Sequence, residues 1–292
     1  EYIGIVESDD WIELDAFERM YRHAKANEVE VVRANYYFYK GGKDKKNLYI
    51  DPMATGRVVD PVRQTWIFYQ APAIWSAIYK RSFLEENDIT FLPTPGASYQ
   101  DTGFNFKVWA SAHRAFFTTE TFLHYRTDNE ASSVKSLGKV FNIAYEYEDI
   151  EKFLREKELF EELGPVLEVA KLGAYYWNVE RLKLSLLPKF LTRMKAEYKK
   201  ADSEGVLIEE YSVNPTQWKM MKFLLKHSIP VVMMRLLFGR MKNAVTRFCK
   251  KIWIVTHPSF QKQRQIREAI TELFAEVDFL ESELKSIKKE QE

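Results

Sequence analysis

The chain has 292 residues, of which 46% are hydrophobic, 15% aromatic and 29% charged. Its length suggests one large domain or two ordinary ones, and its apolar content excludes a disordered or collagen-like protein. With 43 Lys and Arg against 42 Asp and Glu, the whole molecule is not an obvious binder of polyanions. The single cysteine, Cys249, excludes an internal disulfide framework and a zinc site built from several cysteines.

Strand and helix patterns alternate through about residue 125. We expect buried strands at Tyr2–Val6 and Val29–Tyr39, where apolar, β-branched and aromatic residues run together. The further expected elements are helices after Asp15, over Lys80–Asn87 and over Asp101–Ala112, short strands at Ala115–Thr119 and Phe122–Tyr125, and a loop at Lys40–Lys46. This alternation predicts an α/β layer architecture.

We expect no signal peptide within residues 1–30, since they contain no basic segment followed by an apolar stretch and a cleavage site. Residue 1 is Glu, and the first strand pattern starts at once with Tyr2. We therefore expect the chain to begin inside a domain, with upstream residues missing.

From about Leu137 the strand patterns nearly disappear, and residues 137–210 are expected to form a helical extension. The expected helices are Phe141–Leu163 and Val166–Leu187, separated by Gly164-Pro165 and ended by Pro188, and then Phe190–Lys200, with a linker at Ala201–Val206.

Residues 211–267 contain twelve Lys and Arg and no Asp or Glu, interleaved with many apolar residues. The longest uncharged run, Ile252–Gln261, is too short to span a bilayer. A basic, amphipathic stretch with aromatic residues is typical of the membrane interface. We predict that residues 211–260 lie peripherally on the inner, cytoplasmic face of the cell membrane. Whether they insert there or pack on the preceding domain stays open.

Residues 261–292 show a heptad repeat of apolar side chains, which predicts a short coiled coil and a homodimer. Its members are Ile266, Ile270, Leu273, Val277, Leu280, Leu284 and Ile287. The alternative is an amphipathic helix that packs on its own domain.

The first candidate for chemistry is the acidic cluster Glu7-Ser8-Asp9-Asp10 at the carboxyl end of the first predicted strand. Ligands of open α/β sheets bind outside such strand ends. Neighbouring carboxylates repel one another, and a divalent cation such as Mg²⁺ or Mn²⁺, completed by substrate phosphates, relieves that repulsion. The alternative is a solvated acidic turn in which Asp10 or Asp15 caps the next helix.

Two further candidates follow. Asp101 opens a predicted helix, where it serves either as a general base or merely as an N-cap. Arg126 and the pair Ser132-Ser133 have the donors to hold a phosphate, although a surface salt bridge beside a polar loop explains them equally well. His113 and His124 have no partner at metal-ligand spacing, so we interpret both as ordinary histidines.

Taken in order, these segments resemble family 2 glycosyltransferases, the inverting enzymes with a GT-A fold. The matching family motifs are EYIxFxDSDDW at Tyr2–Ile12, xxxWxxLYRRxFL at Ala71–Leu84, YEDxxFN at Tyr99–Asn105, and YYYRxxxxSxS at His124–Arg126 with Ser132-Ser133. The resemblance covers residues 1–136. It implies the second half of a GT-A (nucleotide-diphospho-sugar transferase) sheet with helices, because the family's nucleotide-binding first half has no counterpart here.

The resemblance implies roles for the acidic residues. Asp9 falls where the family coordinates Mn²⁺ or Mg²⁺ on the nucleotide-sugar diphosphate, and Glu7 stands where the family has its first Asp. Asp10 supports this group or the donor diphosphate. Asp101 falls on the general base, and Gln100 replaces the acidic residue before it.

On the same grounds, Trp75 and Gln100 would lie on the acceptor side and Arg126 would contact the donor diphosphate. The implied partners are a nucleotide-sugar donor and a glycan or lipid-linked acceptor, such as a precursor of a surface polysaccharide. The complete protein is expected to transfer sugars, and this fragment alone is expected to be inactive.

Two other classes of function are possible. The replacements at Glu7 and Gln100 and the missing half favour a non-catalytic, membrane-tethered scaffold. Residues 211–267 have enough cations to bind nucleic acid, but their interleaved apolar residues are too numerous for a solvated basic arm. We therefore expect no nucleic-acid partner.

Overall fold

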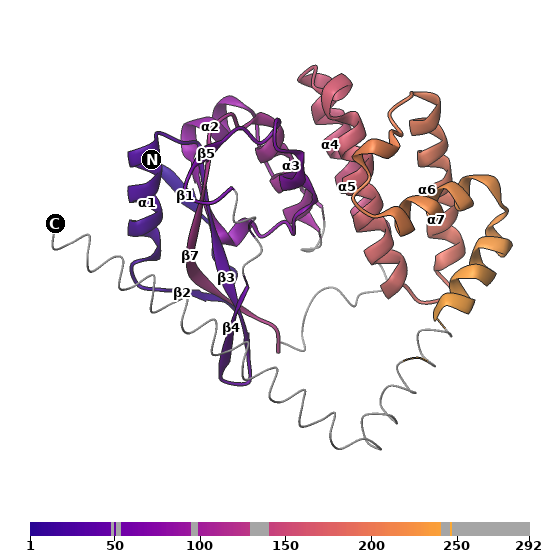
Figure 1. Ribbon diagram of the computed structural model, residues 1–292, viewed down its shortest axis with the longest axis horizontal. Helices are drawn as coiled ribbons and strands as arrows, with labels where there is room; N and C mark the ends of the chain where they lie inside the picture. Colours follow the sequence, from indigo (N-terminus) through magenta and orange to yellow (C-terminus); the bar gives the residue numbers. More distant parts are fainter. Residues whose placement is uncertain (48–49, 51–53, 95–98, 129–139, 241–245, 247–292) are drawn as a thin grey trace. The chain divides into compact units, whose positions relative to one another are not determined.

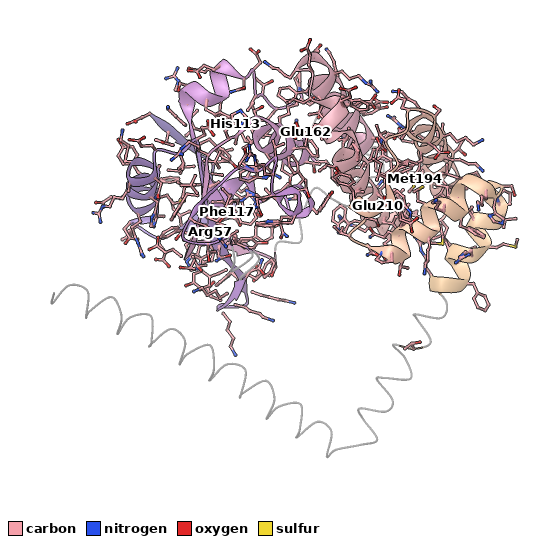
Figure 2. All side chains as sticks on the ribbon, turned by 45° about the horizontal axis from the view of Figure 1, so that its top comes forward. Arg57, His113, Phe117, Glu162, Met194 and Glu210 are labelled. Atoms are coloured by element: carbon pink, nitrogen blue, oxygen red, sulfur yellow. The ribbon has the colours of Figure 1, made fainter. Side chains whose placement is uncertain are left out.

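The computed structural model describes residues 1–47, 50, 54–94, 99–128, 140–240 and 246. The chain divides into two compact units, Glu1–Ile229 and Pro230–Glu292. The elements described here belong to the first unit, which contains a sheet with flanking helices followed by a helical extension (Figure 1). The buried side chains Phe117 and Met194 lie in these two parts (Figure 2).

The sheet has seven strands in the order β1-β6-β3-β7-β2, with β4 paired to β3 and β5 paired to β7. The strands are β1 (Tyr2–Gly4), β2 (Trp11–Ile12), β3 (Val31–Lys40), β4 (Lys43–Asn47), β5 (Val58–Val59), β6 (Ala77–Lys80) and β7 (Ala115–Arg126). Because β6 is antiparallel to both β1 and β3, and β3 is parallel to β7, the strands β1, β3 and β7 run in one direction. Their carboxyl ends therefore meet at one edge.

Alternating side chains of the sheet pack on different helices. Val32 and Ile78 belong to one apolar cluster with Met20 and Ala24 of α1 (Ala16–Asn27). Tyr79, the neighbour of Ile78, instead packs edge-on against Phe104 of a later helix. The sheet thus lies between two helical layers.

The second layer is α3 (Gln100–Ser111), whose residues 103–110 are all buried because it packs on both the sheet and α4. A short helix, α2 (Arg81–Glu86), follows β6, and the turns η1 (Thr65–Tyr69) and η2 (Ile74–Ser76) precede it.

The helical extension contains α4 (Asn142–Glu156), α5 (Phe160–Arg181), α6 (Leu187–Ser203), η5 (Glu209–Tyr211) and α7 (Pro215–Lys226). Its core is aromatic, since the Tyr175 ring meets Tyr147, Phe190 and Tyr198. The predicted α/β class and the predicted helical extension are both confirmed.

Several predicted boundaries were wrong. Pro165 does not break a helix but lies inside α5, because burial of its neighbours Leu163 and Val166 offsets the lost hydrogen bond. The break falls earlier, at Glu158, which has a positive φ of 59°. Gly164 leaves room for the side chain of Val206, because a Cβ added at position 164 would lie 3.1 Å from Val206 Cγ1.

Two corrections concern strands. The predicted loop Lys40–Lys46 is a hairpin in which Gly41 and Gly42, both with positive φ, turn β3 into β4. The pattern missed β4 because its residues are almost all charged. The two short strands predicted within residues 115–125 form one strand, β7, and the predicted linker at 201–206 is helical through Ser203.

The part of the basic segment that the structure describes packs partly on the domain. Trp218, Met221 and Leu224 of α7 are buried, and α7 contacts α5 and α6. None of the helices within the described ranges is long and apolar enough to cross a membrane. Residues 241–245 and 247–260 of this segment, the predicted coiled coil and Ser132-Ser133 lie outside the described residues.

Candidate active site

The acidic cluster lies on the loop that joins β1 to β2. These strands are the two ends of the sheet order, so the loop passes the carboxyl ends of β3 and β7. The Asp10 backbone N–H donates to Glu7 O at 3.2 Å, and Asp10 Oδ1 accepts from the Arg126 backbone N–H at 2.8 Å. The loop is thereby fixed to the end of β7.

His124 anchors the next residue of the loop, Trp11. Trp11, His124 and Tyr37 are cross-strand neighbours, and both aromatic rings stack on the imidazole, at 4.9 and 4.8 Å. His124 Nδ1 lies 2.9 Å from Asp44 Oδ1, and Nε2 lies 3.0 Å from Glu13 Oε1.

These contacts favour the charged form of His124. Burial lowers the pKa of His124, but the hydrogen bonds to Asp44 and Glu13 outweigh that effect and raise the pKa overall. The arrangement is an ion-paired support for the loop.

Tyr125 marks the point where the predicted acidic residues converge. Its pKa is raised by burial and then by the charges of Asp10, Asp9, Asp101 and Glu7. Such effects weaken with distance, so these four carboxylates, from two separate segments, lie near enough to Tyr125 for their charges to act on its phenol. The structure therefore brings together the residues that the sequence analysis assigned to metal and base.

Asp101 lies in the first turn of α3, which begins after a strained residue, Tyr99, with a φ of 67°. Burial raises the pKa of Asp101 to about 6, the Thr102 backbone N–H lowers it, and the charge of Glu7 raises it. A carboxylate with this pKa is ionised at neutral pH, yet it is a stronger base than an ordinary aspartate.

The helical extension holds the start of α3. Tyr99 Oη donates to Asn178 Oδ1 at 3.3 Å, and the Tyr99 ring packs edge-on against Trp177. Gln100 donates from its amide to Leu92 O at 3.1 Å and so fixes the preceding loop. The acceptor-side role of Gln100 stays a prediction.

Trp75 stacks on Tyr125 with ring centroids 4.9 Å apart and packs edge-on against Tyr36. It is half-buried, and its acceptor-side role stays a prediction. The Arg126 guanidinium lies over the rings of Trp11 and Tyr39, on the opposite face of β7 from Tyr125. Its contact with a donor diphosphate stays a prediction.

No group of three or more His, Cys, Asp or Glu in the described part of the chain is arranged to hold a metal ion. Mg²⁺, however, is usually bound by one or two carboxylates together with substrate phosphates. Asp10 Oδ2 is buried and has no hydrogen-bond partner, and Asp9 and Glu7 act on the same carboxyl. The residues present therefore fit an ion that takes most of its ligands from a diphosphate.

Sequence reasoning missed three contributors to this site. Tyr125 stood inside a recognised motif without a role, and Glu13 and Asp44 looked like ordinary surface charges. Only the pairing of β2, β3 and β4 around β7 brings these residues to His124 and the acidic loop.

No family model matches the chain. It is 27% identical over 185 residues to EpsH of Bacillus subtilis, which is named as a glycosyltransferase, covering 58% of this chain and 50% of EpsH. It is also 29% identical over 136 residues to a poly(ribitol-phosphate) beta-glucosyltransferase of Bacillus spizizenii, covering 46% of this chain and 20% of that protein. The chain thus spans half or less of the length of these relatives.

The fold matches solved structures of S. aureus TarS. The crystal structure of TarS 1–349 in complex with UDP-GlcNAc superimposes with a TM-score of 0.60 at 14% identity, covering 82% of this chain and 68% of that chain. The structure of TarS 1–349 superimposes with a TM-score of 0.57 at 15% identity, with coverage of 82% and 67%. The chain therefore has a glycosyltransferase fold and resembles glycosyltransferases in sequence.

Proposed function

We propose that the protein is an inverting, family 2 glycosyltransferase of the GT-A type, which transfers a sugar from a nucleotide-sugar donor to a hydroxyl acceptor. The observation that carries this proposal is the convergence of Glu7, Asp9 and Asp10 with Asp101 around Tyr125. Similarity to proteins named as glycosyltransferases, and to TarS in complex with UDP-GlcNAc, supports the class of donor.

Asp101 is the general base. It accepts the proton of the acceptor hydroxyl while that oxygen attacks the anomeric carbon and the bond to the diphosphate breaks on the opposite side. One displacement of this kind inverts the anomeric centre. Burial raises the pKa of Asp101 to about 6, which keeps it ionised at neutral pH and ready for this step.

Asp9 and Glu7 would hold Mn²⁺ or Mg²⁺, with Asp10 supporting them or the donor diphosphate. A bound ion of this kind stabilises the negative charge of a leaving diphosphate. Arg126 fixes Asp10 through its backbone N–H and adds a cation at the end of β7. Trp75, stacked on Tyr125, offers an aromatic face to the acceptor sugar.

We further propose that the acceptor is a surface-polysaccharide or lipid-linked precursor at the inner, cytoplasmic face of the membrane. The name of the B. spizizenii relative supports a polymer acceptor. Peripheral binding is supported by the exposed Lys219, Lys222 and Lys226 and by the exposed apolar side chains of Met234 and Phe238. A homodimer through residues 266–287 completes the proposal.

Membrane binding is tested by sedimenting the full-length protein with liposomes. We expect binding to vesicles with anionic lipid that weakens as salt rises. Salt-independent binding to neutral vesicles would leave only hydrophobic insertion, and the absence of any binding would contradict the membrane role.

The enzymatic proposal is tested by a turnover screen of the full-length protein with nucleotide sugars and Mn²⁺ or Mg²⁺. We expect transfer by the wild type, loss of transfer in Asp9→Asn and Asp101→Asn, and no turnover by the 292-residue chain alone. Turnover that persists in Asp101→Asn would show that Asp101 is not the general base. Failure of the wild type with all donors would favour a scaffold.

A further inference from the structure

Glu146 is a buried carboxyl that the reaction described above does not use. It lies on α4 of the helical extension, its exposed fraction is 1%, and its Oε2 has no hydrogen-bond partner among the described residues. A buried carboxyl without a partner is costly when it is ionised.

The carboxyl lies against the first turn of α3, the turn that carries Asp101. A Cβ placed on Gly103 would lie only 2.3 Å from Glu146 Oε2. A larger residue at position 103 therefore requires the buried Glu146 carboxyl to shift. The carboxyl of one helix thus occupies the space that a side chain of the other helix normally fills.

Charged groups around Glu146 favour its neutral form. The pKa of Glu146 is raised to about 8, because burial and the charges of Asp149 and Asp101 outweigh the opposing effects of Lys107 and the Gly103 amide. Lys107, however, is already ion-paired with Asp149. The carboxyl is therefore protonated at neutral pH.

We propose that Glu146 is a positioning residue for the general base, and that its neutral carboxyl seats the first turn of α3 so that Asp101 points at the acceptor. This inference rests on the proposed function. Loss of the proton places a buried charge between two helices, close to the carboxylates of Asp101 and Asp149 and opposed only by the Gly103 amide and the already paired Lys107. The first turn of α3 then moves to admit water, and displacements of about 1 Å at a reacting group cost about a hundredfold in rate.

The test is the dependence of kcat/KM on pH for the full-length protein and its Glu146→Gln variant, which keeps the shape of the neutral acid. We expect wild-type activity to fall above about pH 8. Glu146→Gln should retain activity within about twofold at neutral pH, and its alkaline limb should move up by about one pH unit or more.

The matched control is Glu168→Gln. Glu168 is another buried glutamate of the extension, 2% exposed and with an unpartnered Oε2, but it pairs with Lys171 of its own helix. Its replacement should change stability and leave the alkaline limb where it is. The inference is overturned if the alkaline limb of the kcat/KM profile does not move in Glu146→Gln, or if it moves by the same amount in Glu168→Gln.

A second pair of variants tests the contact itself. Gly103→Ala should lower kcat about tenfold with little change in the donor KM, because the new methyl group pushes the base helix away. Adding Glu146→Ala removes the colliding carboxyl and should restore part of that loss, as residues in contact do in a double-mutant cycle. Independent losses that simply multiply would contradict a direct contact.

Thermal unfolding separates the two proposals. Because the folded pKa of Glu146 lies above its usual value, wild-type stability should fall relative to Glu146→Gln as pH rises from about 5 to about 8. If stability depends on pH in this way but the protein transfers no sugar, the proposed function is refuted, whereas the conclusion that Glu146 is buried in its neutral form stands. If the protein transfers sugar but wild type and Glu146→Gln show the same pH dependence of stability, the role of Glu146 is refuted.

Discussion

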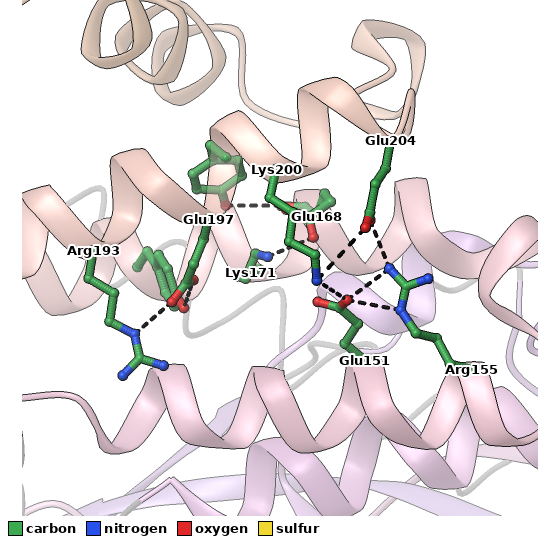
Figure 3. Close-up of polar contacts among 10 residues, drawn as sticks. Glu151, Arg155, Glu168, Lys171, Arg193, Glu197, Lys200 and Glu204 are labelled. Atoms are coloured by element: carbon green, nitrogen blue, oxygen red, sulfur yellow. Dashed lines mark hydrogen bonds and ion pairs between the residues drawn. The ribbon is translucent and has the colours of Figure 1, made fainter.

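The acidic residues at the edge of the sheet and those of one ion-pair network in the helical extension lie in opposite electrostatic surroundings. At the edge, Glu7, Asp9, Asp10 and Asp101 crowd around Tyr125, and the pKa values of Asp10 and Asp101 are raised to about 6, mainly by burial. In the extension, several carboxylates are instead paired with cations, as Figure 3 shows for Glu151 of α4 with Arg155 of the same helix and Lys200 of α6.

This difference in surroundings distinguishes carboxylates that stabilise the fold from carboxylates that are suited to chemistry. Burial raises the pKa of Glu151, but hydrogen bonds from Lys200 and Arg155 outweigh that effect and lower it. Paired carboxylates of this kind stabilise the fold, whereas crowded ones cost stability and keep reactive or ligand-binding oxygens available. A group of carboxylates whose charges act on one another at one strand edge is therefore a better mark of a site than a count of acidic residues.

The largest expected effect is that of Asp101→Asn on the crowded side. It should lower kcat/KM by about 10²- to 10⁴-fold, because the general base is lost. In the wild type, kcat/KM should rise with pH through about 6, where Asp101 loses its proton.

The same variant should be slightly more stable than wild type at neutral pH, by about 1 kcal/mol after allowance for solvent screening. The sign follows from the raised pKa: the folded state loses stability as pH rises from about 4 to about 6. Urea unfolding at pH 4 and pH 7 measures the difference. A variant that is less stable than wild type at pH 7 would contradict a crowded site.

His124 is the paired exception within the crowded region, and His124→Gln should lower the free energy of unfolding by about 2 kcal/mol. Its folded pKa is raised, so its contribution is complete below about pH 6.5 and is lost as pH rises above the raised value. Unfolding at two pH values tests this, with His113→Gln as the control at an exposed histidine.

On the paired side, Glu151→Gln should cost about 1 kcal/mol, because Arg155 and Lys200 lose their shared anion. The Glu151 carboxylate therefore stabilises the folded state at neutral pH, whereas that of Asp101 destabilises it. The contribution of Glu151 is present above pH 4.5 and disappears as pH falls through its lowered pKa. A cost that persists unchanged at pH 3 would argue for packing instead of charge.

The smallest effect is that of Lys200→Met, about 0.5 kcal/mol or less, because this side chain is mostly exposed and Arg155 continues to pair with Glu151. High salt should remove most of the difference between variant and wild type. A loss as large as that of Glu151→Gln would mean that Lys200 carries the network.

Much of the fold and part of the site followed from the sequence. The alternation of strand and helix patterns predicted the α/β class, and Asp101 was correctly expected to open a helix. β4 was missed because a charged edge strand has no apolar alternation, and α5 was divided because Pro165 breaks isolated helices but not one anchored by burial on both sides.

For the site, too, local sequence patterns predicted some features and missed others. The strand ends predicted where Glu7, Asp9 and Asp10 gather, since that depends on local sequence. The approach of Asp101 to Glu7, the support of His124 by Asp44, and the contact of Glu146 with Gly103 join residues that are far apart in the sequence. Such contacts depend on strand order and helix packing, which no local pattern encodes.

The contact between Gly103 and Glu146 also limits how the protein can be recombined. Position 103 belongs to the sheet-and-helix part and position 146 to the extension, so a larger residue at the first requires a smaller one at the second. A chimera that joins the first 128 residues of one relative to the helices of another should work only where these two positions match. The two parts are therefore expected to have diverged as a pair, with compensating changes at this contact.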